Sequence, residues 1–131
     1  QNDMATIRLL WGGETTGARR GGGRGGRNQE LALAAAAQLA LMRAPGVVAS
    51  AGTDGVDGPT AAAGGIVDAP AGDALRARGG DPALVLADND AYAALDAAGA
   101  LLRPGPTHTN VMDVQVALCG AAGAADATGR P

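Results

Sequence analysis

The sequence has no lysine, no phenylalanine and a single cysteine among its 131 residues. Since all ten basic residues are arginine, the chain contains neither a P-loop lysine nor a lysine able to form a Schiff base. The lone Cys119 excludes an internal disulfide and a cysteine-rich zinc site, and one free thiol is typical of a reducing compartment. Trp11 and Tyr92 are the sole aromatic residues, so the core must consist mainly of alanine, valine and leucine.

Long apolar runs are also missing. The longest, residues 31–42, contains Gln38 and falls short of the roughly 20 apolar residues that a membrane-spanning helix needs. No leader peptide opens the chain, so we expect a cytoplasmic protein without a membrane partner. The net charge of −3 argues against binding of polyanions by the chain as a whole, and we expect no nucleic-acid partner. The chain starts at Gln1 instead of Met, which hints at a piece of a longer polypeptide.

The predicted elements alternate along the chain. Buried strands are expected at residues 7–11, 47–51, 101–102 and 111–118. Helices are expected from the N-cap Asn28 to Pro45, from Thr60 through Val67, over 81–87 and over 90–99, with a turn or two at 73–78. This order predicts an α/β fold, a single compact domain over residues 1–119 with a mixed or parallel sheet flanked by helices. Residues 120–131, rich in alanine and glycine, are expected to be a flexible tail.

Three polar, glycine-rich loops each follow a predicted strand, at residues 12–28, 52–60 and 105–110. In α/β sheets, ligands bind in the loops that follow the carboxyl ends of the strands. One shared site built from these three loops is therefore expected.

The loop at residues 21–27 is compatible with several functions. Its glycines satisfy the dinucleotide pattern G-x-G-x-x-G, but almost any run this rich in glycine would do so. An RGG-type RNA-binding segment would repeat and would carry aromatic residues, and this one does neither. The two remaining interpretations are an anion cradle of backbone amides at a helix N-terminus, assisted by Arg24 and Arg27, and a plain surface loop. The residues alone leave both open.

Acidic residues in the other loops are equally open to interpretation. Asp54 and Asp57 stand three apart between glycines, where paired carboxylates can hold Mg²⁺ or position a hydroxyl group, or serve as ordinary turn residues. Glu14 follows two glycines at the end of a buried strand, and a solvated loop acid is the commoner outcome there. His108, the single histidine, is a candidate base or ligand, although a lone loop histidine is more often neither.

Several stretches, taken together, resemble a known family. In order, they read GGETT at 12–16, GRGGRNQELAL at 23–33, SAGTDGVDGPTAAAGGIVD at 50–68, ADNDAY at 87–92 and GPTHTNVMD at 105–113. This set is similar to the C-terminal, or MOFRL, domain of the glycerate 2-kinase family, over about residues 5–119. The resemblance implies a two-domain α/β enzyme in which a larger N-terminal Rossmann-like domain shares an active-site cleft with this domain. It also implies transfer of the γ-phosphoryl group of ATP to the 2-hydroxyl of D-glycerate, with Mg²⁺, and an isolated fragment that is inactive.

The resemblance also implies which residues act. The active-site positions fall on Glu14, Arg27, Asp54 and Asn110. The amides of Gly23, Arg24, Gly25 and Gly26 would lie near the bound anion, and Asp54 and Asp57 are candidate metal ligands. The sequence departs from the family pattern at residues 17–20, at His108 and at Met112.

Two alternatives to the kinase remain at this point. One is a stand-alone module that binds a small anion or nucleotide without catalysis. The other is an NAD(P)H-dependent hydroxypyruvate reductase, a name that some family members carry. It is less favoured because the domain has no convincing nicotinamide site.

Overall fold

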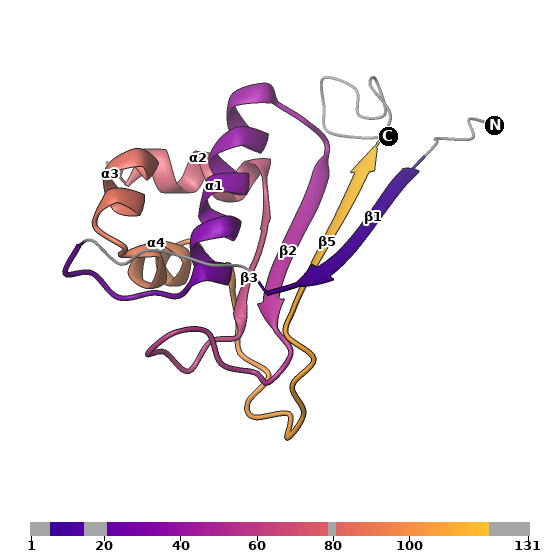
Figure 1. Cartoon of the computed structure of the whole chain (residues 1–131). Helices are drawn as coiled ribbons and strands as arrows, with labels where there is room; N and C mark the ends of the chain where they lie inside the picture. Colours follow the sequence, from indigo (N-terminus) through magenta and orange to yellow (C-terminus); the bar gives the residue numbers. More distant parts are fainter. Residues whose placement is uncertain (1–5, 15–20, 79–80, 121–131) are drawn as a thin grey trace.

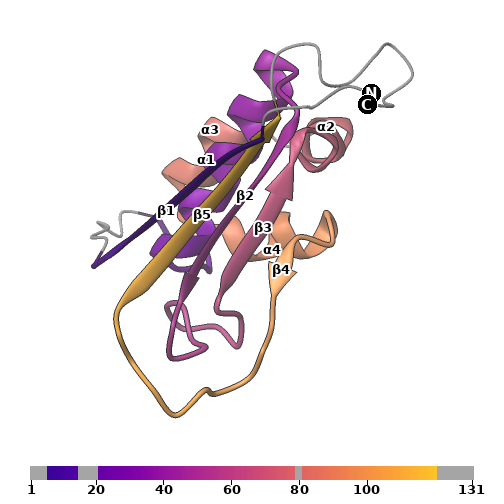
Figure 2. The ribbon, with the colours of Figure 1, turned by 90° about the vertical axis from the view of Figure 1, so that its right-hand side faces the viewer.

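The computed structural model describes residues 6–14, 21–78 and 81–120, which form one sheet with helices packed on it (Figures 1 and 2). The sheet order is β1-β5-β2-β3-β4. The strands are β1 Thr6–Gly13, β2 Gly46–Gly52, β3 Gly64–Asp68, β4 Leu101–Leu102 and β5 Asp113–Gly120. The helices are α1 Arg27–Met42, α2 Ala69–Ala77, α3 Pro82–Ala87 and α4 Ala91–Ala97.

The single compact α/β domain is confirmed, but the expected direction of the sheet was wrong. Every pair of neighbouring strands in the described chain is antiparallel. The difference arises at residues 60–67, where the predicted helix from Thr60 is instead a loop followed by β3. Without a helical crossover, β2 and β3 form a hairpin, and a hairpin makes its two strands antiparallel.

Two glycines explain why the alanine-rich segment after Thr60 forms a strand. A Cβ atom at Gly64 would lie 1.8 Å from the carbonyl oxygen of Ser50, and one at Gly65 would lie 2.9 Å from the Cβ of Ala32. Because β3 packs this closely against β2 and α1, only glycine fits at both positions. This requirement comes from tertiary packing and is invisible in local sequence patterns.

Most of the other predicted elements are present. The strands predicted at 7–11, 47–51, 101–102 and 111–118 correspond to β1, β2, β4 and β5, and the helices at 81–87 and 90–99 to α3 and α4. The turn expected at 73–78 is part of the longer helix α2. The departures at 17–20 and residues 121–131 of the expected tail lie outside the described residues, whereas Gly120, which we expected to begin the tail, is the last residue of β5.

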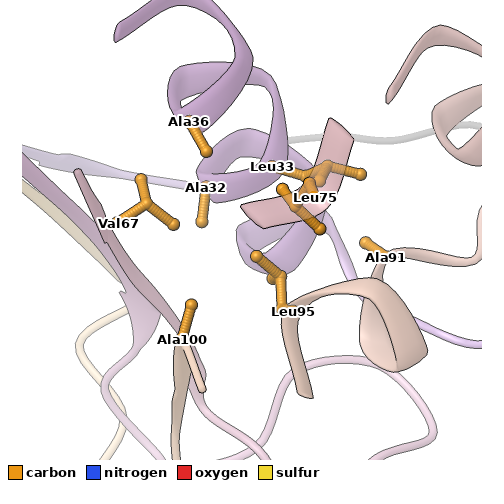
Figure 3. Close-up of a cluster of buried hydrophobic side chains, with 8 residues drawn as sticks. All are labelled: Ala32, Leu33, Ala36, Val67, Leu75, Ala91, Leu95 and Ala100. Atoms are coloured by element: carbon orange, nitrogen blue, oxygen red, sulfur yellow. The ribbon is translucent and has the colours of Figure 1, made fainter. Parts of the chain in front are cut away.

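The core lies between the sheet and the helices α1, α2 and α4 (Figure 3). It consists mainly of alanine and leucine, as the shortage of aromatic residues predicts. Small side chains on α1 allow it to approach the sheet and α2 closely. The buried cluster comprises Ala32, Leu33, Ala36, Val67, Leu75, Ala91, Leu95 and Ala100.

The helices cover one face of the sheet, so the expectation of flanking helices holds for that face alone (Figures 1 and 2). Cross-strand register places Leu10, Val116, Ala49 and Ile66 in one row on the opposite face. Leu10 is 74% exposed and Ile66 45% exposed. The face without helices in the described chain is therefore largely apolar.

The contact between α1 and α2 gives a stability prediction. A Cβ at Gly72 would lie 2.2 Å from the carbonyl oxygen of Ala36, so α2 crosses α1 almost backbone to backbone. We expect Gly72→Ala to lower the free energy of unfolding by about 1–3 kcal/mol through overpacking, although glycine to alanine normally stabilises a helix. Urea denaturation of the chain measures the change. Gly22→Ala, whose Cβ would meet nothing within 4 Å, is the matched control and should change stability little, and a more stable Gly72→Ala variant would contradict this packing.

Candidate functional site

Three strands bring their loops to one end of the sheet. Asp113, the first residue of β5, pairs with Gly13 at the end of β1 and with Gly52 at the end of β2. Because β5 runs opposite to its neighbours, its beginning lies beside their carboxyl ends, and the N-terminus of α1 lies at the same end. The expected meeting of the three polar loops is thus confirmed, although the sheet is antiparallel.

Arg27 and Asp113 form the central contact of this loop cluster. The Nε of Arg27 donates to Asp113 Oδ2 at 2.7 Å, and its Nη2 donates to Asp113 Oδ1 at 3.0 Å. The side chain of Asp113 is fully buried, while that of Arg27 is 36% exposed. The hydrogen bond to Asp113 raises the pKa of Arg27 above its ordinary value, although partial desolvation opposes the shift, and the charges of Asp113, Asp57 and Glu14 raise it further. Arg27 therefore stays positively charged, and Glu14 lies close enough to act on it.

Asp57 caps α1 from a distant loop. Its Oδ1 accepts hydrogen bonds from the backbone N of Asn28 at 3.0 Å and from Asn28 Nδ2 at 3.1 Å. Its Oδ2 accepts one from the backbone N of Gln29 at 2.9 Å, and the residue is 1% exposed. A carboxylate at this position favours the positive end of the helix dipole. Asp57 thus acts as an internal anion at the helix N-terminus.

Asn28 does not cap α1 as the sequence predicted. The N-cap is Gly26, and Asn28 lies inside the helix. Its buried amide links the network, because Nδ2 also donates to Asp113 Oδ1 at 3.1 Å and Oδ1 accepts from Ser50 Oγ at 2.7 Å. A Cβ at Gly26 would lie 2.3 Å from Asp57 Cγ. The absence of a side chain at Gly26 therefore makes room for the carboxylate of Asp57, which caps α1.

The glycine-rich loop packs against the turn before α4. Its backbone amides donate to acceptors in that turn: Gly21 N to Asn89 Oδ1 (2.9 Å), Gly22 N to Asp88 Oδ1 (3.1 Å), Gly23 N to Asp88 O (2.8 Å) and Arg24 N to Asp90 Oδ1 (3.0 Å). The predicted anion cradle is therefore corrected at Gly23 and Arg24, whose amides are engaged within the chain. The amides of Gly25 and Gly26 make no hydrogen bond within the described residues.

Arg24 is held away from the Arg27 site. Its guanidinium stacks over the ring of Tyr92, 4.5 Å from the centroid, and its Nε donates to the Pro59 carbonyl at 3.4 Å. Its side chain is exposed. These contacts account for Arg24 without a bound anion.

Asp54 lies beside Asp113. A Cβ built on Gly52 would be 3.1 Å from Asp54 Oδ1 and 3.6 Å from Asp113 Oδ1, so the two carboxylates approach the same point from different loops. Asp54 Oδ1 also accepts from the backbone N of Val56 at 3.1 Å. Asp54, Arg27 and Glu14 are thus brought to one end of the sheet, as the sequence predicted.

The loop that carries Asn110 is tied to the loop that carries Asp54. The backbone N of Val111 donates to Thr53 Oγ1 at 2.8 Å, and the backbone N of Thr53 donates to the Met112 carbonyl at 2.9 Å. Asn110 is exposed, and its Oδ1 accepts from the backbone N of Met112 at 2.9 Å. Asn110 therefore lies on the rim of the loop cluster, with its amide nitrogen directed to no described partner.

The residues at this end of the sheet do not form a metal site on their own. No group of three or more histidine, cysteine, aspartate or glutamate side chains in the described chain is arranged to hold an ion. Both oxygens of Asp57 already serve the helix N-terminus. The suggested metal role of Asp57 is therefore not favoured, and Asp54 is the better placed of the two candidate ligands.

Two further candidates from the sequence are His108 and Cys119. His108 is exposed on the loop before β5, with a backbone φ of 61°, and Cys119 lies near the opposite end of β5. At that opposite end, a groove of about 880 Å³ is lined by the end of α1, the start of β2 and part of α2. It contains none of the residues that the sequence singled out.

The sequence suggested Asp113 as a hydrogen-bonding residue, but it revealed neither its pairing with Arg27 nor the bridging role of Asn28. Asp113 pairs with a residue 86 positions away, and Asn28 with carboxylates 29 and 85 positions away. Asp113 does stand at the end of the motif GPTHTNVMD, directly before an alternating strand, and this position was the available signal.

Comparison with known proteins agrees with this architecture. The MOFRL family matches residues 7–113. The chain is 56% identical over 111 residues to D-glycerate 2-kinase of Thermotoga maritima, covering 84% of this chain and 26% of that protein. It is 45% identical over 116 residues to a putative hydroxypyruvate reductase of Agrobacterium vitis, covering 86% of this chain and 26% of that protein. The crystal structure of glycerate kinase from T. maritima superposes with a TM-score of 0.81 at 53% identity, covering 86% of this chain and 27% of that one.

The chain thus spans about a quarter of the length of these relatives. In the part of the chain that the structure describes, no helix has the length and apolar character needed to cross a membrane.

Proposed function

We propose, on the premise that this chain belongs to the MOFRL family, that it forms the C-terminal part of an ATP-dependent glycerate 2-kinase. The reaction transfers the γ-phosphoryl group of ATP to the 2-hydroxyl of D-glycerate in a cleft shared with an N-terminal Rossmann-like domain. One observation carries the proposal: a chain 56% identical to a D-glycerate 2-kinase places Arg27, Asp54 and Glu14 at one end of its sheet. The cytoplasm, where ATP is abundant, is the proposed location.

Phosphoryl transfer depends on positioning and on neutralising negative charge more than on covalent chemistry by the protein. Arg27 has the free guanidinium edge and the permanent charge to bind the carboxylate of glycerate or a phosphate oxygen. Asp54 or Glu14 would accept the proton of the 2-hydroxyl group, because a carboxylate can act as a general base. Asn110 would donate from its amide to the substrate at the rim of the loop cluster.

The local charge balance explains why the chain would need a larger protein. Among the described residues, the carboxylates of Glu14, Asp57 and Asp113 act on the guanidinium of Arg27, and that of Asp54 lies beside Asp113, so negative charge is in excess at this end of the sheet. Anions such as glycerate and ATP are repelled by such an excess of negative charge unless further cations are present. Mg²⁺ arriving with the phosphates of ATP, and basic groups of the N-terminal domain, would supply them.

The same charge balance disfavours a stand-alone module that binds small anions. The reductase alternative is favoured only by the name of the A. vitis relative. The glycine-rich loop, which would have to bind the dinucleotide, donates its amides to the turn at 88–90 instead. The kinase therefore has the better physical support.

An enzyme assay on the complete gene product tests the proposal. With D-glycerate and MgATP, we expect ADP to form, as followed by a coupled assay. With hydroxypyruvate and NADH or NADPH, we expect no oxidation of the nicotinamide. Dinucleotide oxidation without glycerate-dependent ADP release would overturn the kinase in favour of the reductase.

The isolated 131-residue chain should show no kinase turnover. Among the residues that the structure describes, the site holds Arg27 and several carboxylates, and we expect the further cations that phosphoryl transfer needs to come from MgATP and from the rest of the complete gene product. The same coupled assay at high protein concentration measures this, with the complete gene product as the positive control. Glycerate-dependent ADP formation by the purified chain would show that no second domain is required.

A further inference from the structure

We propose that Asp113 is the positioning residue of Arg27: it holds the guanidinium so that the Nη1 edge faces the substrate anion. This inference deepens the proposed function and rests on it. It assigns a role in the reaction to a residue that does not itself reach the ligand, because the side chain of Asp113 is fully buried.

The contact restricts Arg27 in two directions at once. Two parallel hydrogen bonds, from Nε at 2.7 Å and from Nη2 at 3.0 Å, fix both the position and the plane of the guanidinium. A guanidinium has five N–H donors. The other three point away from Asp113 and make no hydrogen bond within the described residues, so they remain for a ligand. The pair therefore leaves one defined edge of Arg27 open.

Asp113 is itself held rigidly. Its Oδ1 accepts a third hydrogen bond from the buried Asn28 Nδ2 at 3.1 Å. Its backbone is part of the sheet, opposite Gly13 and Gly52. A carboxylate anchored both in a central strand and to α1 can transmit the rigidity of the sheet to Arg27, as pre-organised binding requires.

The exposure of the two partners distinguishes positioning from a purely structural ion pair. A structural pair would satisfy both groups in the interior, whereas Arg27 is 36% exposed and lies where three loops converge. Arg103 offers the contrast: it pairs with Asp96, and both side chains are about half exposed, with one hydrogen bond at 2.9 Å. The Arg27–Asp113 pair instead has one buried and one accessible partner, which is the arrangement expected of a held ligand-binding group.

A double-mutant cycle in the complete gene product tests the proposal. We expect Asp113→Asn to lower kcat/KM for D-glycerate by about three- to tenfold, mainly through KM, because the asparagine keeps the shape but loses the charge and one acceptor. In an Arg27→Ala background, the same substitution should change kcat/KM by less than about twofold, since Asp113 acts through Arg27. Asp68→Asn, which alters a helix-capping carboxylate away from the site, is the matched control and should leave kcat/KM unchanged. An equal loss with and without Arg27 would overturn positioning in favour of a structural role, and so would unchanged kinetics for the Asp113→Asn variant.

A spectroscopic measurement separates this proposal from the kinase assignment. In the 131-residue chain, the Nε–H proton of Arg27 should exchange slowly with water in NMR spectra, and Asp113→Asn should abolish that protection at unchanged chemical shifts of α4. The wild-type gene product could lack kinase activity while its Arg27 Nε–H exchanges slowly and the Asp113→Asn variant exchanges fast. In that case the kinase proposal fails, but the positioning of Arg27 by Asp113 stands. Fast exchange of the Arg27 Nε–H in the wild-type chain would show that Asp113 does not fix the guanidinium of Arg27.

Discussion

Replacing Arg27 with alanine in the complete gene product should lower kcat/KM for D-glycerate at least about tenfold, equivalent to about 1.4 kcal/mol of transition-state stabilisation. Among the described residues, Arg27 provides a permanent positive charge beside the carboxylates of Asp113, Asp57 and Glu14 at this end of the sheet. Without it, these carboxylates would repel a bound anion. Steady-state kinetics with glycerate as the varied substrate measure the loss.

Two further variants show whether activity depends on the paired hydrogen bonds of the Arg27 guanidinium or on its charge alone. Arg27→Lys keeps the charge but cannot form two parallel hydrogen bonds with Asp113, so it should recover only part of the lost activity. Arg76→Ala removes an exposed arginine of α2, beside the groove at the opposite end of the sheet, and should leave kcat/KM unchanged. Because Arg27→Ala leaves the buried Asp113 without its partner, the melting temperature of each variant must be measured alongside. Unaltered kinetics in a folded Arg27→Ala protein would remove Arg27 from the mechanism.

Asp57→Ala should cause the largest loss of stability among single substitutions at the loop cluster, about 3 kcal/mol. The buried carboxylate accepts three hydrogen bonds, from the backbone N of Asn28 and of Gln29 and from Asn28 Nδ2. Alanine leaves these donors without an acceptor in a site closed to water, and it removes the favourable charge at the start of α1. Thermal unfolding followed by circular dichroism should show a melting temperature lower by about 10 °C.

Asp81→Ala is the matched control for this substitution. Asp81 also caps a helix, α3, but it is exposed and accepts a single hydrogen bond, from the backbone N of Ala83 at 2.9 Å. We expect this variant to lose only about 0.5–1 kcal/mol, because water can replace the missing oxygen. If Asp57→Ala were no more harmful than Asp81→Ala, the buried network around Asn28 would contribute no more than an ordinary helix cap.

Local patterns in the sequence predicted the elements that depend on local chemistry. Pro82, directly after the helix-capping Asp81, predicted α3. The alternation of Val114, Val116 and Leu118 predicted β5. The three polar loops were recognisable because glycine, aspartate and asparagine set turn conformations within a few residues. Their meeting at one end of the sheet follows from strand order and did not require the mixed or parallel sheet that we expected.

Long-range contacts account for what the sequence did not reveal. The amides of Gly21 and Arg24 find their acceptors 68 and 66 residues away, so the loop resembled an unfilled anion cradle when taken by itself. Likewise, Asp57 caps the N-terminus of α1 although it lies 29 residues after Asn28 in the sequence. The strand β3 was predicted as a helix because its pairing with β2, and the close approach at Gly64, are decided by packing.

A crystal structure of the complete gene product with D-glycerate tests the central claim most directly, since that claim is the location of the substrate. We predict the carboxylate or the accepting hydroxyl of glycerate within hydrogen-bond distance of the Nη1 edge of Arg27, with Asp54 and Asn110 on the same side of the ligand. Glycerate bound in the groove between the end of α1 and α2, or wholly outside this chain, would contradict the account.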